Sequence, residues 1–284
     1  MKTSKLIVVI SGIGLLFSCS QNEPAEKLKT QQVTEIDSMY ESADEDFVLP
    51  PFLSIAKSFK NAGLVYAKGK TNPVENSKNY ELKIKRLLNM GIYSTDLAYC
   101  SLNNKNQEAR EYLKVIQELS NEVGLGSVFQ DQALLDRFDQ SLEKREDLEG
   151  FIYDLQERSE MYLQDNELRH IATVQFAGAW IEGMYLGVGN AIKYPNEKVT
   201  GVLTDQMYLV KNMIRGLESY PDPTPELKEI IAGLTKILTT YEAFESVKNK
   251  PKNPNLKAVL ISQDELKVLL TEVVKVRTNI VSIN

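Results

Sequence analysis

The stretch Ile171–Ala191, IATVQFAGAWIEGMYLGVGNA, is apolar on almost every helical face and contains a single acidic residue, Glu182. A helix that is apolar all round is either buried in a protein core or spans a membrane. The stretch is long enough for a span, since roughly 18 apolar residues suffice. Its buried acid, its many glycines and the lack of a Lys/Arg bias around it argue against one. We therefore expect the buried central helix of a helical domain.

Small residues form a continuous line along this expected helix. They are Ala179, Gly183, Gly187 and Ala191, each four positions after the last. Glycine costs about 1 kcal/mol in a helix interior relative to alanine, so several of them need a compensating contact. Close approach of a second helix provides such a contact. We expect that neighbour to be the helix through Gly91 and Ala98, with the two helices crossing at their glycines.

Amphipathic periodicity extends over the rest of the chain and predicts an all-α bundle of about nine helices. The expected helices cover residues 50–68, 79–102, 109–123, 127–138, 148–162, 165–194, 199–217, 225–244 and 262–280. Their predicted end signals are Gly124 as a C-terminal stop, capping boxes at Ser127/Gln130 and Ser262/Glu265, and an N-cap at Thr224 followed by a proline. No sustained alternation of apolar and polar residues suggests a strand.

Two of the expected helices resemble each other. Met90-Gly91-Ile92-Tyr93 corresponds to Ala177-Gly178-Ala179-Trp180, and each segment is followed by an acid, Asp96 or Glu182. The chain could thus be two pseudo-repeated four-helix units, 76–164 and 165–284, that meet at a pseudo-twofold axis. Convergence on the same helical pattern is an equally open explanation.

The N-terminus has the pattern of a secretory signal, with Lys2 and Lys5 before an apolar run, Leu6–Phe17. Leu16-Phe17-Ser18-Cys19 resembles the lipobox of bacterial lipoproteins, although Phe17 is larger than the residue usual there. This resemblance implies cleavage before Cys19 and acylation of that residue, and two or more acyl chains give stable membrane anchoring. Ser20 in place of Asp favours the outer membrane. An ordinary secretory signal with an incidental cysteine is the alternative.

The resulting organisation is a signal peptide at 1–18, a flexible acidic tether at 19–49 and an all-α domain at 50–284. The domain is loosely similar to all-helical lipoproteins of Gram-negative bacteria, without a diagnostic motif. The net charge of −6 argues against nucleic acid as a partner. We expect membrane attachment through the lipid anchor, and an envelope protein or a small ligand as the partner.

Few residues could carry catalysis or hold a metal. His170 is the only histidine, and Cys100 is the only cysteine left after lipidation, so multi-histidine zinc sites and cysteine clusters are excluded. Glu167-x-x-His170 has the spacing of a di-iron motif, but the second such motif is missing. Nucleophile-elbow and phosphate-loop patterns are absent from the sequence. We therefore assign no catalytic residue, no metal ligand and no cofactor, and expect Cys100 to be a buried hydrophobic side chain.

Asp96 and Glu182 stand out because each is an acid among small and apolar residues on an expected central helix. A buried carboxylate is costly unless it is paired, hydrogen-bonded or protonated. The two acids could line a polar pocket whose walls would be Tyr93, Tyr99, Trp180 and Tyr185. Alternatively, they accept hydrogen bonds from tyrosine, lysine or arginine and fix the helix register. The sequence favours a non-catalytic binding or scaffold protein, and a ligand- or metal-binding protein or enzyme using this pocket is the alternative.

Overall fold

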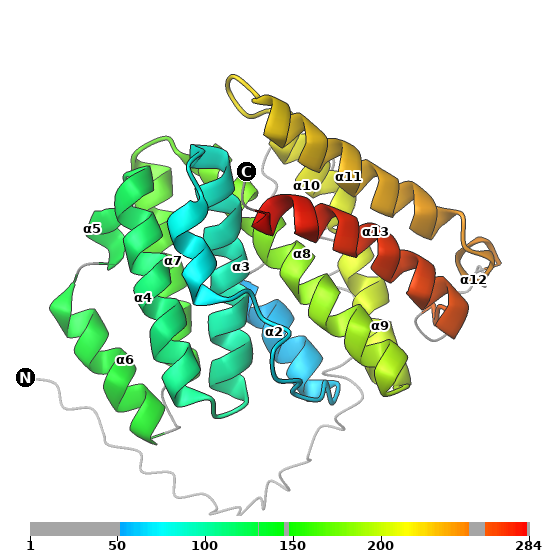
Figure 1. The fold of residues 1–284 in the computed structure, drawn as a ribbon, viewed down its shortest axis with the longest axis horizontal. Coiled ribbons are helices and arrows are strands. Elements are labelled where there is room, and N and C mark those ends of the chain that lie inside the picture. Colours follow the sequence, from blue (N-terminus) through cyan, green and yellow to red (C-terminus); the bar gives the residue numbers. More distant parts are fainter. Residues whose placement is uncertain (1–51, 130, 145–147, 250–258, 283–284) are drawn as a thin grey trace, which may run out of the picture. The chain divides into compact units, whose positions relative to one another are not determined.

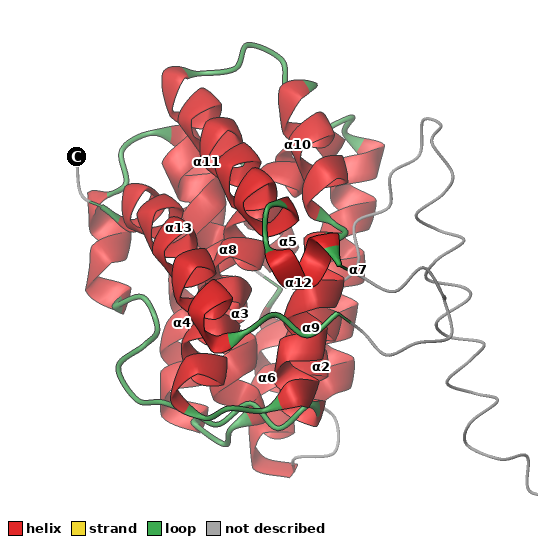
Figure 2. Ribbon diagram, turned by 90° about the vertical axis from the view of Figure 1, so that its right-hand side faces the viewer, coloured by secondary structure: helices red, strands yellow, loops and turns green. Residues whose placement is uncertain are grey.

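The computed structural model describes residues 52–129, 131–144, 148–249 and 259–282, all within the unit Asp46–Asn284. Helices and loops make up these ranges, and they contain no strand (Figure 2). The predicted all-α class is therefore confirmed. The expected signal peptide, Cys19 and the tether lie outside the described residues. None of the described helices is both long and apolar enough to cross a membrane.

Twelve α-helices and one short 3-10 helix occur in the described ranges (Figure 1). In chain order they are α2 Phe52–Asn61, η1 Val74–Asn79, α3 Lys83–Leu102, α4 Asn106–Val123, α5 Gly126–Phe129, α6 Gln132–Lys144, α7 Leu148–Asp165, α8 Arg169–Lys193, α9 Glu197–Met207, α10 Val210–Glu218, α11 Pro225–Glu242, α12 Glu245–Lys248 and α13 Gln263–Val281. The apolar stretch of α8 is buried along most of its length, as predicted.

Helices α3 and α8 cross at their glycines. A Cβ atom on Gly91 would lie 1.8 Å from the carbonyl oxygen of Gln175, and one on Gly178 would lie 1.9 Å from that of Leu88. Each glycine thus faces the carbonyl group three residues before the other glycine, so the contact is reciprocal. The predicted crossing is confirmed, and its local geometry is that of a twofold axis. The proposed duplication of the whole chain stays a prediction.

The line of small residues is only partly used in this crossing. Ala179 lies at it, because its carbonyl oxygen accepts a hydrogen bond from the Thr95 hydroxyl at 3.1 Å. The next two members face other helices. A Cβ atom on Gly183 would meet Ile55 and Phe59 of α2, and one on Gly187 would meet Phe59 and Leu203 of α9. The expectation that the whole line packs on α3 was wrong, because a straight line of i, i+4 positions rotates away from a crossing helix after about one turn.

Helix α13 lies along α8 and also packs on α3 and α11 (Figure 1). Its N-terminus has the predicted capping box, in which Ser262 and Glu265 exchange side-chain-to-backbone hydrogen bonds. At its C-terminus, the carbonyl oxygens of Asn279 and Ile280 accept hydrogen bonds from Lys85 and Asn89 of α3. Buried polar side chains of α3 thus satisfy carbonyl groups that a helix end leaves without partners.

Two predicted helix boundaries were wrong because the chain reverses at residues with a left-handed backbone. The first helix ends at Asn61 rather than near Lys68, since Gly63 has φ 94°. The helix expected from Asp165 begins only at Arg169, and Asp165 ends α7 instead. Glu167, with φ 59°, forms the turn between α7 and α8. Glutamate is rare in this conformation, so the sequence carries no signal for the turn.

The helix expected over 199–217 is two helices, α9 and α10. In a continuous helix the Gln206 carbonyl oxygen would accept from the backbone of Val210. Here it accepts a hydrogen bond from the Trp180 indole at 3.2 Å and one from the backbone N–H of Leu209. The Trp180 side chain of the central helix therefore interrupts the backbone hydrogen bonding between α9 and α10.

The predicted capping box at Ser127 was also wrong. Ser127 lies inside the short α5, and α6 begins at Gln132. The side chain of Asp131 accepts a hydrogen bond from the Ala133 backbone N–H at 2.9 Å and so takes the capping role. The expected start of the second helix, near Asn79, was early as well, because 74–79 form η1 and α3 begins at Lys83.

Candidate functional site

Asp96 of α3, Glu182 of α8 and Arg277 of α13 meet in the interior, and we call these three residues the carboxylate cluster. Both acids are fully buried. The structure thus brings together the two positions that the sequence singled out, from helices 86 residues apart along the chain. It adds a basic partner that the sequence analysis did not identify.

Glu182 and Arg277 form a bidentate ion pair. The Arg277 Nε donates to Glu182 Oε2 at 2.6 Å, and Nη2 donates to Oε1 at 2.9 Å. The guanidinium also stacks on the Tyr185 ring, with Cζ 4.2 Å from the ring centroid. Planar two-bond pairing of this kind is the strongest geometry for a buried carboxylate. Arg277 therefore contacts both carboxylate oxygens of Glu182, and each oxygen keeps a second lone pair.

Asp96 is held differently. Its Oδ2 accepts a hydrogen bond from the backbone N–H of Asn72 at 2.9 Å. Its buried Oδ1 has no donor among the described residues. A protonated Oδ1 can instead donate to Glu182, whose carboxylate lies within hydrogen-bonding reach. The orphaned oxygen is thus explained if Asp96 keeps its proton.

The electrostatics of the cluster agree with this assignment. Burial, and then the negative charge of Glu182, raise the pKa of Asp96 well above its ordinary range. Burial also raises the pKa of Glu182, but Arg277 opposes that rise. When two carboxyl groups share one site, the one without the cation retains the proton. The cluster then carries one negative and one positive charge, and it is neutral as a whole.

Asn72 anchors the loop before η1 against the cluster. Besides its N–H bond to Asp96, its side-chain amide donates to Tyr80 at 3.0 Å, and its carbonyl oxygen accepts from Tyr112 at 3.2 Å. Its side-chain oxygen accepts from Asn76 at 2.9 Å. Asn72 is completely buried, although it belongs to a loop. The polar network therefore extends from the cluster to α4 and η1.

The predicted pocket walls fall into two groups. Tyr185 contacts the cluster through its stacking on Arg277. Tyr93 lies beside it and is fully buried. Its hydroxyl donates to the Pro73 carbonyl oxygen at 3.0 Å, and burial, followed by the neighbouring Tyr80, raises its pKa.

The other two predicted walls bind elsewhere. The Tyr99 hydroxyl accepts from the Ala67 backbone N–H at 2.6 Å, and burial raises the pKa of Tyr99 to about 12. The Trp180 indole donates to the Gln206 carbonyl oxygen of α9, so its polar group is directed away from the cluster.

Arg277 of the cluster and Asn72, which donates to Asp96, are the residues that sequence reasoning missed. Arg277 had a usable signal, because it occupies a position in the line Leu266, Leu270, Val273, Arg277, Ile280, where apolar residues alternate at spacings of three and four. A charged residue in such a line needs a buried partner. Asn72 gave no signal, because its role depends on the tertiary path of a loop.

The remaining candidates are accounted for by packing. His170 packs edge-on against the Tyr220 ring, with centroids 4.9 Å apart, and burial lowers its pKa. Glu167 precedes α8, so it does not share a helical face with His170. Cys100 is buried, as expected, and burial raises the pKa of its thiol to about 12. Within the described ranges, no three His, Cys, Asp or Glu side chains are grouped to hold a metal ion.

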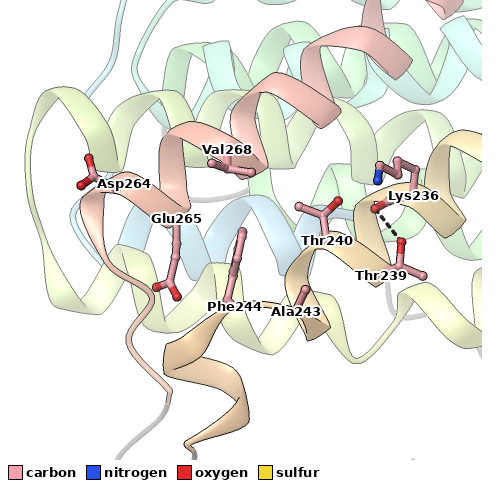
Figure 3. A pocket seen from close by; sticks show the side chains of 8 residues that line it. All are labelled: Lys236, Thr239, Thr240, Ala243, Phe244, Asp264, Glu265 and Val268. Carbon is pink, nitrogen blue, oxygen red and sulfur yellow. Dashed lines mark hydrogen bonds between the residues drawn. The ribbon is translucent and has the colours of Figure 1, made fainter.

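The two larger hollows found among the described residues contain no member of the cluster, and a third, of about 20 Å³, lies between α2, α3 and α8. One is an open groove of about 550 Å³ between α11 and α13, over Phe244 and Val268 (Figure 3). Glu265, at its edge, is already engaged by Ser246 and Ser262. The other is a cavity of about 100 Å³ between α3, α4, α5, α7 and α8, with mainly apolar walls.

Comparison of the chain with family models, with curated proteins and with solved structures found no match.

Proposed function

We propose that this protein is a lipid-anchored, non-catalytic binding or scaffold protein of the bacterial cell envelope. The anchor would be Cys19, with the acidic segment 19–49 as a tether that holds the helical domain off the outer membrane. This part of the proposal depends on the N-terminal sequence pattern.

The non-catalytic part is supported by one observation, the state of the carboxylate cluster. A catalytic acid or base must reach a substrate proton directly or through one water molecule. Asp96 and Glu182 are fully buried, Glu182 is chelated by Arg277, and Asp96 is held by the loop at Asn72. The cluster and its bond to Asn72 connect three helices and a loop, so we assign it a structural role.

The alternative, a ligand- or metal-binding protein or enzyme using Asp96 and Glu182, is tested by the double variant Asp96→Asn/Glu182→Gln. Both substitutions preserve side-chain shape while removing ionisable groups. Native mass spectrometry and metal analysis of the wild-type chain, together with partner capture from envelope extracts by both chains, separate the two accounts. We expect a wild-type chain without metal or small molecule at the cluster, and the same captured partners for both chains.

A metal or small molecule bound to the wild-type chain and lost from the double variant would overturn the structural assignment. Asp222→Asn is the matched control, because Asp222 is exposed on the turn between α10 and α11 and asparagine tolerates its φ of 54° equally well.

A further inference from the structure

The cavity between α3 and α7 shares no residue with the carboxylate cluster. Its walls are formed by Met90, Gly91, Ser94, Leu97, Ile116, Phe129, Leu155, Ser159, Glu160, Leu163, Ala172, Gln175, Phe176 and Ala179. Its volume is about 100 Å³. Protein interiors pack so densely that they leave few voids larger than a water molecule. A space of this size beside the most closely packed helix pair therefore needs an explanation.

Small side chains make the room. Gly91 and Ser94 of α3 and Ala172 and Ala179 of α8 line the cavity where larger apolar residues would fill it. Close approach of the two helices needs only the glycines at the crossing, as the backbone contacts of Gly91 and Gly178 demonstrate. Ser94 and Ala172 lie away from that contact, so the crossing does not require them to be small.

The cavity wall is chemically apolar, even where serines contribute to it. The Ser94 hydroxyl donates to the Met90 carbonyl oxygen at 2.7 Å, and the Ser159 hydroxyl donates to that of Leu155 at 2.9 Å. Both hydroxyl protons are thus used within their own helices. Water needs two to four polar partners to be stable in a cavity, and this wall offers few.

Gln175 is the exception. Its side-chain Nε2 donates to the Met90 sulfur at 3.7 Å, and thioether sulfur is a weak acceptor. No donor within the described ranges contacts its side-chain oxygen. This half-buried amide therefore offers a donor and an acceptor to a molecule in the cavity.

We propose that this cavity binds a small neutral amphiphile, consisting of one six-membered ring or a short alkyl segment with a single hydroxyl or amide group hydrogen-bonded to Gln175. An apolar cavity of about 150 Å³ binds benzene, and this cavity is smaller, at about 100 Å³, so one ring is the largest group that it could hold. The cavity wall is mainly apolar and includes no lysine or arginine, so burying a carboxylate there would leave its charge unpaired and is disfavoured. This inference rests on the proposed binding function and gives the chemical class of one ligand.

The test uses the full chain carrying Cys19→Ala, which removes acyl chains and the need for detergent, with phenol, benzene and benzoate as probes in NMR titrations. We expect saturable 1:1 binding of phenol. Benzene is expected to bind about five-fold more weakly, because it lacks the one neutral hydrogen bond to Gln175. Benzoate is expected to bind more weakly still. Gln175→Met is expected to equalise phenol and benzene.

Ala172→Leu fills the cavity from α8, and Ser94→Leu fills it from α3. Each is expected to weaken phenol binding at least ten-fold in a chain that keeps or gains thermal stability. Ala243→Leu, in the groove of Figure 3, is the matched control and is expected to bind phenol as before.

The site would be overturned if no probe showed saturable binding. It would also be overturned if phenol still bound with unchanged affinity to a folded Ala172→Leu or Ser94→Leu variant. Equal affinity for phenol and benzene in the wild-type cavity would overturn the role of Gln175. Acylation of Cys19 is measured separately on the wild-type chain. If no probe binds and Cys19 is acylated, the cavity proposal fails. The proposed function then stands, with a macromolecule as the partner of the anchored protein.

Discussion

Asp96 is a fully buried carboxyl group whose pKa is raised well above its ordinary value, and this rise has a measurable effect on stability. In the unfolded chain its carboxyl group titrates near pH 3.9, whereas burial raises the folded-state pKa. The folded state therefore binds more protons than the unfolded state over the interval between the two pKa values. Its contribution to stability is fully present below about pH 4 and is lost as pH rises through the folded-state pKa.

Asp96→Asn removes this dependence while its amide still pairs with Glu182. The stability of the wild-type chain relative to this variant is expected to fall by about 1.4 kcal/mol per pH unit above pH 4, until the folded-state pKa is reached. Urea denaturation of both chains between pH 4 and pH 9 measures this difference in unfolding free energy, with Asp222→Asn as control. Parallel stability curves for wild type and Asp96→Asn would contradict the raised pKa.

Arg277 is the second residue-scale test. Arg277→Met leaves Glu182 buried without its cation, and breaking a buried ion pair on one side costs about 3–5 kcal/mol. Adding Glu182→Gln removes the stranded charge, so the double variant is expected to recover more than about 2 kcal/mol of that loss. A double-mutant cycle from denaturation curves measures the coupling. Additive effects of the two substitutions would mean that the pair contributes little.

At the scale of elements, the crossing of α3 and α8 determines how closely the two central helices pack. Gly178→Ala would place a Cβ atom 1.9 Å from the Leu88 carbonyl oxygen, so we expect a loss of about 3 kcal/mol or more. Gly189, in the same helix, has no atom within 4 Å of such a Cβ. Gly189→Ala is therefore expected to stabilise the protein by about 0.5–1 kcal/mol. Thermal unfolding of the two variants tests this contrast, and equal effects would contradict the crossing.

The helices were predictable where the deciding interactions are local. Thr224 and Ser262 cap α11 and α13 as expected, and Gly124 ends α4 with φ 88°. These signals act within three or four residues, so the sequence carries them directly. The break between α9 and α10 depends on Trp180, which is 26 residues away from Gln206, and no local pattern encodes it.

The cluster, too, was predictable only in the part that depends on local sequence. Asp96 and Glu182 were identifiable because each is an acid among apolar neighbours on its own helix. Their junction with Arg277, 95 residues after Glu182, depends on how α13 packs on α8. Sequence periodicity predicts which face of a helix is buried, but not which other helix covers it.

At the scale of the whole molecule, the buried charges of the helical domain stabilise its fold, and the attachment to the envelope that we propose depends on Cys19. The described domain has a continuous apolar core through which α3 and α8 connect the remaining helices. The fold therefore explains how the domain is held together, and the proposed membrane attachment depends separately on the N-terminal sequence.

The most direct test of the central claim is the chemical state of Cys19 in chains purified from membranes. We expect metabolic labelling with an alkyne fatty acid to mark the wild-type chain, and mass spectrometry to find an acylated Cys19 as its first residue. Cys19→Ala should be unlabelled and released from the membrane fraction. A wild-type chain with an unmodified Cys19, or a Cys19→Ala chain that keeps its lipid label, would contradict the account.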